Sequence, residues 1–218
     1  MKKKIKTPWP TKDVMNQIYD LHLWGGKDFD FYSGFGSHDA HIVEPYLEAV
    51  STFLKSHNNL LTICDLGCGD FNIGKQLTQY TKKYIGIDIV DNLIKRNKKR
   101  FKAKNLEFHC LNIVEDDLPN ADCIILRQVL QHLSNAEILK VVQKLSNYNH
   151  VILTEHLPIG NFEPNKDIIS GQGIRIKKQS GVDVLVEPFN LKVKDTKILN
   201  EIIPEDNKGV IVTVLYSL

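Results

Sequence analysis

Two acids, Asp65 and Asp88, and the turn Gly67-Cys68-Gly69 have the spacing of a site for a nucleotide-like ligand. The apolar run over residues 60–66 carries Asp65 and leads directly into this turn, which precedes a helix-like segment. Glycines let the backbone approach a ligand closely, and the following helix offers free N–H groups. Asp88 ends the next apolar run, where a carboxylate can accept both hydroxyls of a ribose. The pattern predicts a small-molecule cofactor on a strand-to-helix turn.

The same spacing disfavours a dinucleotide. A dinucleotide fingerprint has a third glycine three residues after the second, and Asn72 stands at that position. A nucleotide-sugar-modifying oxidoreductase therefore stays a weaker alternative, which titration with NAD would separate.

The elements that must position these residues alternate between strands and helices, which predicts a parallel sheet with crossover helices. We expect strands near 60–66, 83–89, 106–112, 121–127 and 150–156, and helices near 72–81, 91–101 and 135–147. Ser134 and Glu137 have the spacing of a capping box at the start of the last helix. Cofactor and substrate should lie beyond the carboxyl ends of the strands.

The two ends of the chain add helices and a hairpin. Thr11 is predicted to cap a helix that reaches about Trp24 and stops at Gly25-Gly26. A glycine-rich turn over residues 31–39 leads to a second helix near 40–55. Two strand-like runs, 197–203 and 210–216, predict a C-terminal hairpin.

The length of 218 residues and the composition fit one α/β domain. The formal net charge of +2 is too small to indicate a nucleic-acid or membrane partner. The basic segment MKKKIK is not followed by a long apolar run, so we expect no signal peptide, and no stretch reaches membrane-spanning length. The four cysteines lack zinc or disulfide spacing, which favours reduced thiols in the cytoplasm. No metal site is predicted.

The D-x-G-x-G motif from Asp65 to Gly69, with Asp88, resembles class I S-adenosylmethionine (SAM)-dependent methyltransferases. The segments FDFYSGFGSHD, ICDLGCGDFNIG, YIGIDIV, ILRQVLQHLSN, ILTEH and IRIKKQSGV resemble a group of small bacterial members that methylate small molecules. The resemblance implies an α/β fold with a Rossmann-like seven-stranded sheet, mostly parallel with an antiparallel C-terminal strand. It divides one domain, 1–218, into an N-terminal helical lid (1–58), a SAM-binding core (59–156), a substrate-side insertion (157–190) and a C-terminal hairpin (191–218).

The resemblance also implies SAM as the cofactor and assigns its binding residues. Asp65 would reach the ammonium group, the glycine turn the methionine part, Asp88 the ribose and Asn112 the adenine amino group. The full expected set is Tyr32, Ser33, Gly34, Ser37, Asp65, Gly67, Cys68, Gly69, Asp88, Ile89, Asn112, Ile113, Arg127 and Gln128.

Candidates for catalysis stand at or just after the fourth and fifth strands. His132 and His156 have the pKa range of a general base, and each is also interpretable as a capping or packing residue. Arg127 ends a buried strand, where a guanidinium needs an anion or several acceptors. With Arg175 and Glu155 as substrate-binding residues, these positions favour methyl transfer to an O or N atom of a small, anionic metabolite, such as a nucleotide-linked or phosphorylated precursor of a surface glycan or natural product.

Two further functions stay open. An RNA or protein methyltransferase is disfavoured because Leu126-Arg127-Gln128 stands where an Asn-Pro-Pro-Tyr-like tetrad would follow the fourth strand. A non-catalytic subunit of the same fold would bind and activate a partner enzyme. The basic residues over 95–104 are interpreted as a solvated helix face and not as an RNA groove.

Overall fold

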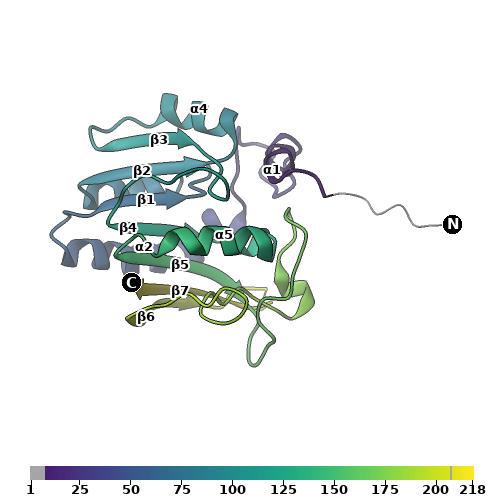
Figure 1. Ribbon diagram of the computed structural model, residues 1–218. Helices are drawn as coiled ribbons and strands as arrows, with labels where there is room; N and C mark the ends of the chain where they lie inside the picture. Colours follow the sequence, from purple (N-terminus) through teal and green to yellow (C-terminus); the bar gives the residue numbers. More distant parts are fainter. Residues whose placement is uncertain (1–7, 207) are drawn as a thin grey trace.

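A seven-stranded sheet organises the computed structural model, which describes residues 8–206 and 208–218 (Figure 1). The basic segment MKKKIK lies outside the described residues. The strands are β1 (Thr62–Leu66), β2 (Lys83–Asp88), β3 (Leu106–Cys110), β4 (Cys123–Arg127), β5 (His150–Leu157), β6 (Asp195–Ile202) and β7 (Val210–Ser217). The α-helices are α1 (Thr11–Asp20), α2 (Ala40–Ser56), α3 (Gly74–Leu77), α4 (Asp91–Arg100) and α5 (Asn135–Leu145). Short 3₁₀ turns are η1 (Phe35–Ser37), η2 (Thr78–Tyr80), η3 (Leu130–His132) and η4 (Arg175–Lys178).

The strand order is β3-β2-β1-β4-β5-β7-β6. Strands β1 to β5 pair in parallel, and β7 enters antiparallel between β5 and β6. This confirms the predicted Rossmann-like sheet and its hairpin. Strand order reverses between β1 and β4, so the carboxyl ends of these two strands form the crevice in which ligands of such sheets bind.

Alternation along the strands gives the sheet two apolar faces, as expected where helices cover both sides. Ile63, Ile125 and Ile152 face α2, whereas their neighbours along β1, β4 and β5 face α5. Both layers are buried. The position of a residue along its strand therefore decides whether its side chain lies on the α2 face or the α5 face of the sheet.

The N-terminal helices differ from the prediction in detail. The prediction that Thr11 caps α1 is wrong: Pro10, which has no polar side chain, stands at the cap position, and the Thr11 hydroxyl donates to Glu137 on α5. The helix ends at Asp20, before Trp24. Asp39 caps α2 by accepting from the Ile42 amide at 3.3 Å. The capping box of Ser134 and Glu137 is confirmed.

The part of the N-terminal segment that covers the strand ends is shorter than residues 1–58. Tyr46, Val50 and Leu54 of α2 are buried against the sheet, so this helix is a layer of the core. Residues 8–39, with α1, lie beyond the carboxyl ends of the parallel strands (Figure 1). We call residues 8–39 the lid.

Arg175 anchors the segment after β5 and does not face the cavity described below. Its side chain is 1% exposed and donates to main-chain oxygens of Lys166, Leu130, Gln131 and Leu133, at 2.8 to 3.4 Å. A fifth bond goes to the Asn135 side chain at 2.7 Å. The guanidinium is committed to protein oxygens, so the prediction that Arg175 binds substrate is wrong for this arrangement.

No helix in the described part of the chain is both long enough and apolar enough to cross a bilayer. The four cysteines are free thiols, as predicted.

Replacing Arg175 with Gln should destabilise the fold by roughly 3 kcal/mol, because several buried carbonyl groups lose a charged donor. Chemical denaturation measures this free energy of unfolding. Lys177→Gln, at an exposed position of the same 3₁₀ turn, is the matched control and should change it by less than about 0.5 kcal/mol. An Arg175→Gln protein of unchanged stability with a raised KM for the acceptor would restore the substrate-binding role.

Candidate functional site

A cavity of about 600 Å³ opens at the carboxyl ends of β1 and β4, within the size range of small-molecule sites. The glycine turn, the lid, the end of β4, η3, the segment after β5 and the β6–β7 turn all contribute lining residues. A smaller cavity of about 90 Å³ adjoins it beside Asp88, Asn112 and Ile113. His132 borders both cavities.

Two constraints act on the glycine turn: its backbone dihedral angles and the close approach of neighbouring side chains. Gly67 and Gly69 have φ of +80° and +54°, a region that side chains disfavour. A Cβ on Gly69 would lie 2.3 Å from the Ser33 hydroxyl, and one on Gly67 would lie 2.5 Å from a methyl of Val129. The lid and the residues after β4 therefore press directly on the turn.

Asp70 joins the lid to the glycine turn. This buried carboxylate accepts from the Ser33 amide at 2.9 Å and from the Asn72 amide at 3.0 Å, and its oxygen lies 2.6 Å from His38 Nε2. In return the Asp70 amide donates to the Ser33 hydroxyl at 2.8 Å. Tyr32 stacks on His38 with ring centres 4.4 Å apart. Asp70 thus holds the predicted residue Ser33 at the cavity, whereas the predicted residue Tyr32 is not among the lining residues of either cavity. Sequence reasoning missed Asp70 although it directly follows Gly69.

A second link runs from α4. Buried Asn97 donates to the Gly69 carbonyl at 2.7 Å, and Arg96 donates to the Asp70 carbonyl at 2.8 Å. Arg96 also pairs with Asp30 of the lid at 2.7 Å. The interpretation of residues 95–104 as a solvated face is therefore wrong for Arg96, which braces the lid.

Asp88 is buried at the end of β2 and already supports the turn. It accepts from the Gly69 amide at 3.1 Å and from the Val90 amide at 3.0 Å. Burial raises the pKa of Asp88 to about 6, which the amide bonds offset in part. Each carboxylate oxygen has further acceptor capacity, so Asp88 can still take a ribose hydroxyl from the smaller cavity.

Ile89, Asn112 and Ile113 line the smaller cavity beside Asp88, as the cofactor assignment requires. The Asn112 side-chain oxygen accepts from the Val114 amide at 3.0 Å. Its remaining lone pair is available to an adenine amino group.

Asp65 and Arg127 end neighbouring strands on the α2 side of the sheet. Tyr84 donates to Asp65 at 2.8 Å, and burial raises the pKa of Asp65 to about 7. Arg127 donates to the Ser37 hydroxyl at 3.2 Å and to the Gly36 carbonyl, which ties η1 of the lid to β4. Both side chains line the larger cavity.

Gln128 follows Arg127 with φ of +56° and donates its amide to the Thr154 carbonyl at 2.7 Å. A Cβ on Gly36 would lie 2.3 Å from the Gln128 side-chain oxygen, so a larger residue there would require the flexible Gln128 side chain to move. Gly34, with φ of +85°, and Cys68 complete the predicted lining.

His132 is a neutral imidazole with a partner at each ring nitrogen, and its Nε2 lies 3.4 Å from the Gln131 side-chain nitrogen. Its Nδ1 lies 3.0 Å from the Gly171 carbonyl, which assigns the proton to Nδ1 and leaves a lone pair on Nε2. Burial lowers the pKa of His132 to about 4. Trp24 packs on the ring at 5.1 Å between centres.

His156 and Glu155 lie on opposite faces of β5, because successive side chains alternate. His156 lines the larger cavity, and burial lowers its pKa. Glu155 is 3% exposed on the other face, near Arg175, and burial raises its pKa to about 8. The prediction that Glu155 binds substrate is therefore wrong for this arrangement.

The described residues contain no group of three or more His, Cys, Asp or Glu side chains placed to hold a metal ion.

Comparison with known proteins gives a family match over part of the chain. Residues 64–149 match the family described as a methyltransferase domain. An uncharacterized RNA methyltransferase of Chlamydia pneumoniae is 28% identical over 131 residues, which are 56% of this chain and 32% of that protein. A carboxy-S-adenosyl-L-methionine synthase of Idiomarina loihiensis is 29% identical over 112 residues, 49% of this chain and 46% of that protein. The chain thus matches less than half the length of either relative.

The fold is shared more widely. The N-methyltransferase NodS of Bradyrhizobium japonicum, solved with S-adenosyl-L-homocysteine, superposes with a TM-score of 0.62 at 11% identity, covering 93% of this chain and 98% of that one. Residues 64–149 thus match a methyltransferase domain, and the chain has the fold of methyltransferases solved with S-adenosyl-L-homocysteine or with their cofactor, SAM. The glycine cradle, the two strand-end carboxylates and the paired cavities fit this cofactor.

Cofactor binding should strengthen as pH rises toward 7. Without ligand the pKa of Asp65 is raised to about 7, and the ammonium group of a bound ligand would lower it, so binding releases a proton below that pH. The association constant of S-adenosylhomocysteine should fall up to roughly tenfold per pH unit below about 7. Calorimetry between pH 5.5 and 7.5 measures it. In Asp65→Asn this pH dependence should flatten, and an unchanged slope would contradict the assignment.

Proposed function

We propose that the chain transfers the methyl group of SAM to an O or N atom of a small, anionic molecule bound in the larger cavity. The observation that carries the proposal is the set of segments that line this cavity. The glycine turn supplies one wall, and the lid, the segment after β5 and the β6–β7 turn line the others. Such a space suits a small acceptor lying next to the cofactor.

Methyl transfer from SAM mainly requires that the acceptor atom be correctly positioned. SAM supplies a methyl group activated by a sulfonium, so the protein must align the acceptor and exclude water. His132 borders both cavities, and a hydroxyl could donate to its Nε2 in place of the long 3.4 Å contact with the Gln131 side-chain amide. His156 lines the acceptor side. The low pKa of His132 favours orientation of the acceptor over strong general-base catalysis.

Support for an anionic acceptor now rests on Arg127. Arg175 is committed to main-chain oxygens away from the cavity, whereas Arg127 lines it. In the part of the chain that the structure describes, Arg127 makes no ion pair. Its charge is therefore available to a carboxylate or phosphate.

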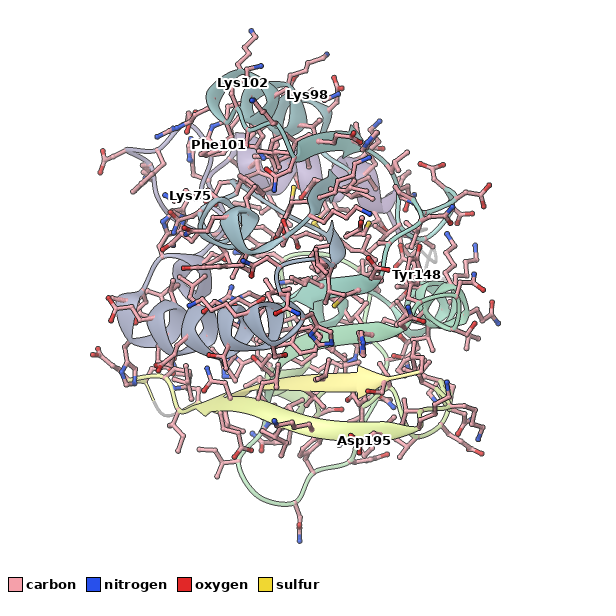
Figure 2. All side chains as sticks on the ribbon, turned by 90° about the vertical axis from the view of Figure 1, so that its left-hand side faces the viewer. Lys75, Lys98, Phe101, Lys102, Tyr148 and Asp195 are labelled. Atoms are coloured by element: carbon pink, nitrogen blue, oxygen red, sulfur yellow. The ribbon has the colours of Figure 1, made fainter. Side chains whose placement is uncertain are left out.

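An RNA acceptor is the second candidate, because one relative is described as an RNA methyltransferase. The basic residues give it little support. Lys98 and Lys102 lie near the end of α4 on the side of the sheet that faces away from α1 (Figure 2). An RNA strand bound to these lysines would not enter the cavity under the lid.

The test is transfer of a labelled methyl group from SAM to pools of small anionic metabolites and, separately, to RNA. Labelled product in the metabolite pool alone supports the proposal. Product only in RNA favours the second candidate. SAM binding without transfer to either favours a non-catalytic subunit.

With an acceptor identified, His132→Asn and His156→Asn should each lower turnover. The loss should be about 10²- to 10⁴-fold if the histidine takes a hydroxyl proton, and only a few fold if it orients an acceptor that is already nucleophilic. SAM affinity should stay nearly constant. His109→Asn, on the exposed face of β3, is the control and should match the wild type. Wild-type turnover in both cavity variants would contradict the assigned roles.

A further inference from the structure

We propose that Gln131 is a positioning residue that sets the proton arrangement of His132 and selects a hydroxyl group as the methyl acceptor. The inference rests on the proposed function and narrows its acceptor atom from oxygen or nitrogen to a hydroxyl oxygen. Gln131 and His132 both belong to the turn η3, and both line the larger cavity. No sequence pattern singles out Gln131.

The side-chain amide of Gln131 has one orientation. Its oxygen accepts from the His156 amide on β5 at 3.2 Å. Its nitrogen lies 3.4 Å from His132 Nε2. Exchanging the two amide atoms would set an NH₂ group against the His156 N–H, so that two donors would face each other. The Gln131 amide therefore presents its donor to His132.

The ring of His132 is held from its other side by the segment after β5. His132 Nδ1 lies 3.0 Å from the Gly171 carbonyl, and the Gly171 amide donates to the His132 carbonyl at 2.9 Å. With the proton on Nδ1, Nε2 carries a lone pair, which is what the Gln131 donor requires. Gly171 and Gln131 thus favour the same neutral tautomer.

The Gln131 N–H and the His132 lone pair form a neighbouring donor and acceptor at the cavity. The 3.4 Å separation of the two nitrogens is long for a hydrogen bond, so a ligand can replace this contact at little cost. A group that replaces it must accept from Gln131 and donate to His132. A hydroxyl does both, since it has one proton and two lone pairs.

The number of lone pairs separates a hydroxyl from other acceptors. A hydroxyl oxygen can accept from Gln131 with one lone pair and attack the methyl carbon with the other. A neutral amine has a single lone pair, which a bond from Gln131 would occupy. An ionised carboxylate or phosphate oxygen brings no proton for His132.

The proton balance of the transfer fits a neutral His132. The O–C bond forms and the S–C bond breaks, the S–C electron pair goes to sulfur, and the hydroxyl proton goes to His132 Nε2. The oxygen becomes strongly acidic as it gains the methyl group, so a weak base at hydrogen-bond distance suffices.

The first test observes the tautomer without cofactor or acceptor. NMR of the ¹⁵N-labelled full chain near neutral pH, with the His132 signals assigned through His132→Asn, should show a proton on Nδ1 and none on Nε2. Gln131→Glu keeps an oxygen for the His156 amide but replaces the donor with a carboxylate oxygen, so Nε2 should become protonated. A wild type protonated at Nε2, or unchanged His132 signals in Gln131→Glu, would overturn the positioning role.

Gln143→Glu is the matched control, because Gln143 is exposed on α5 and the substitution adds the same charge. Its His132 signals should equal those of the wild type. If Gln131→Glu does not fold, Gln131→Met replaces it, since Met has a similar volume and no donor. Loss of the Gln131 N–H should then shift the Nε2 signal of His132, and an unshifted signal would contradict the contact.

The second test identifies the methylated atom. The labelled product from the metabolite pool should carry its new methyl group on oxygen as an ether. With that acceptor, Gln131→Met should lower kcat/KM roughly three- to tenfold, because one hydrogen bond to the acceptor is lost, while the affinity for S-adenosylhomocysteine stays constant. A methylated amine, a methyl ester, or wild-type kcat/KM in Gln131→Met would overturn the selection of a hydroxyl.

The two tests separate this inference from the proposed function. Absence of transfer to every pool would contradict the proposed function and the selection of a hydroxyl together. The NMR measurement needs no turnover, so it would still decide whether Gln131 positions His132.

Discussion

The buried carboxylate of Asp70 is the contact on which the cavity depends. It directly follows the glycine turn and binds the Ser33 amide and the His38 ring, so one side chain joins the cofactor turn to the lid. Arg96 and Asn97 add main-chain contacts to Asp70 and Gly69. Because these groups share bonds, the shape of the turn and the closure of the lid are set together.

Successive side chains of the central strands point to opposite faces of the sheet, and this separates the residues that line the cavity from those that anchor the segment after β5. Asp65, Arg127 and His156 project on the α2 side at successive strand ends and line the larger cavity. Glu155, one residue before His156, projects on the opposite side, toward Arg175. One face of the sheet edge therefore carries the candidate chemistry, while the other secures the segment after β5 that helps to line the cavity.

Much of this was predictable because it is local. Apolar runs, strand-end acids and glycine spacing identified β1 to β5, Asp65, Asp88 and the turn, and the Ser134 capping box fixed the start of α5. The contacts that hold the site together join distant residues, such as Ser33 with Asp70, Gln131 with His156, and Arg175 with the carbonyls after η3. No single stretch of sequence encodes such pairings, so Arg175 and Glu155 were assigned to substrate, and Asp70 and Gln131 were missed.

Calorimetric titration of the full chain with SAM and with NAD tests the central claim most directly. The glycine turn closes on the lid without the third glycine of a dinucleotide site, and two carboxylates face the adjoining cavities. The account predicts saturable binding of SAM in the micromolar range and no binding of NAD. Binding of NAD without binding of SAM would contradict it.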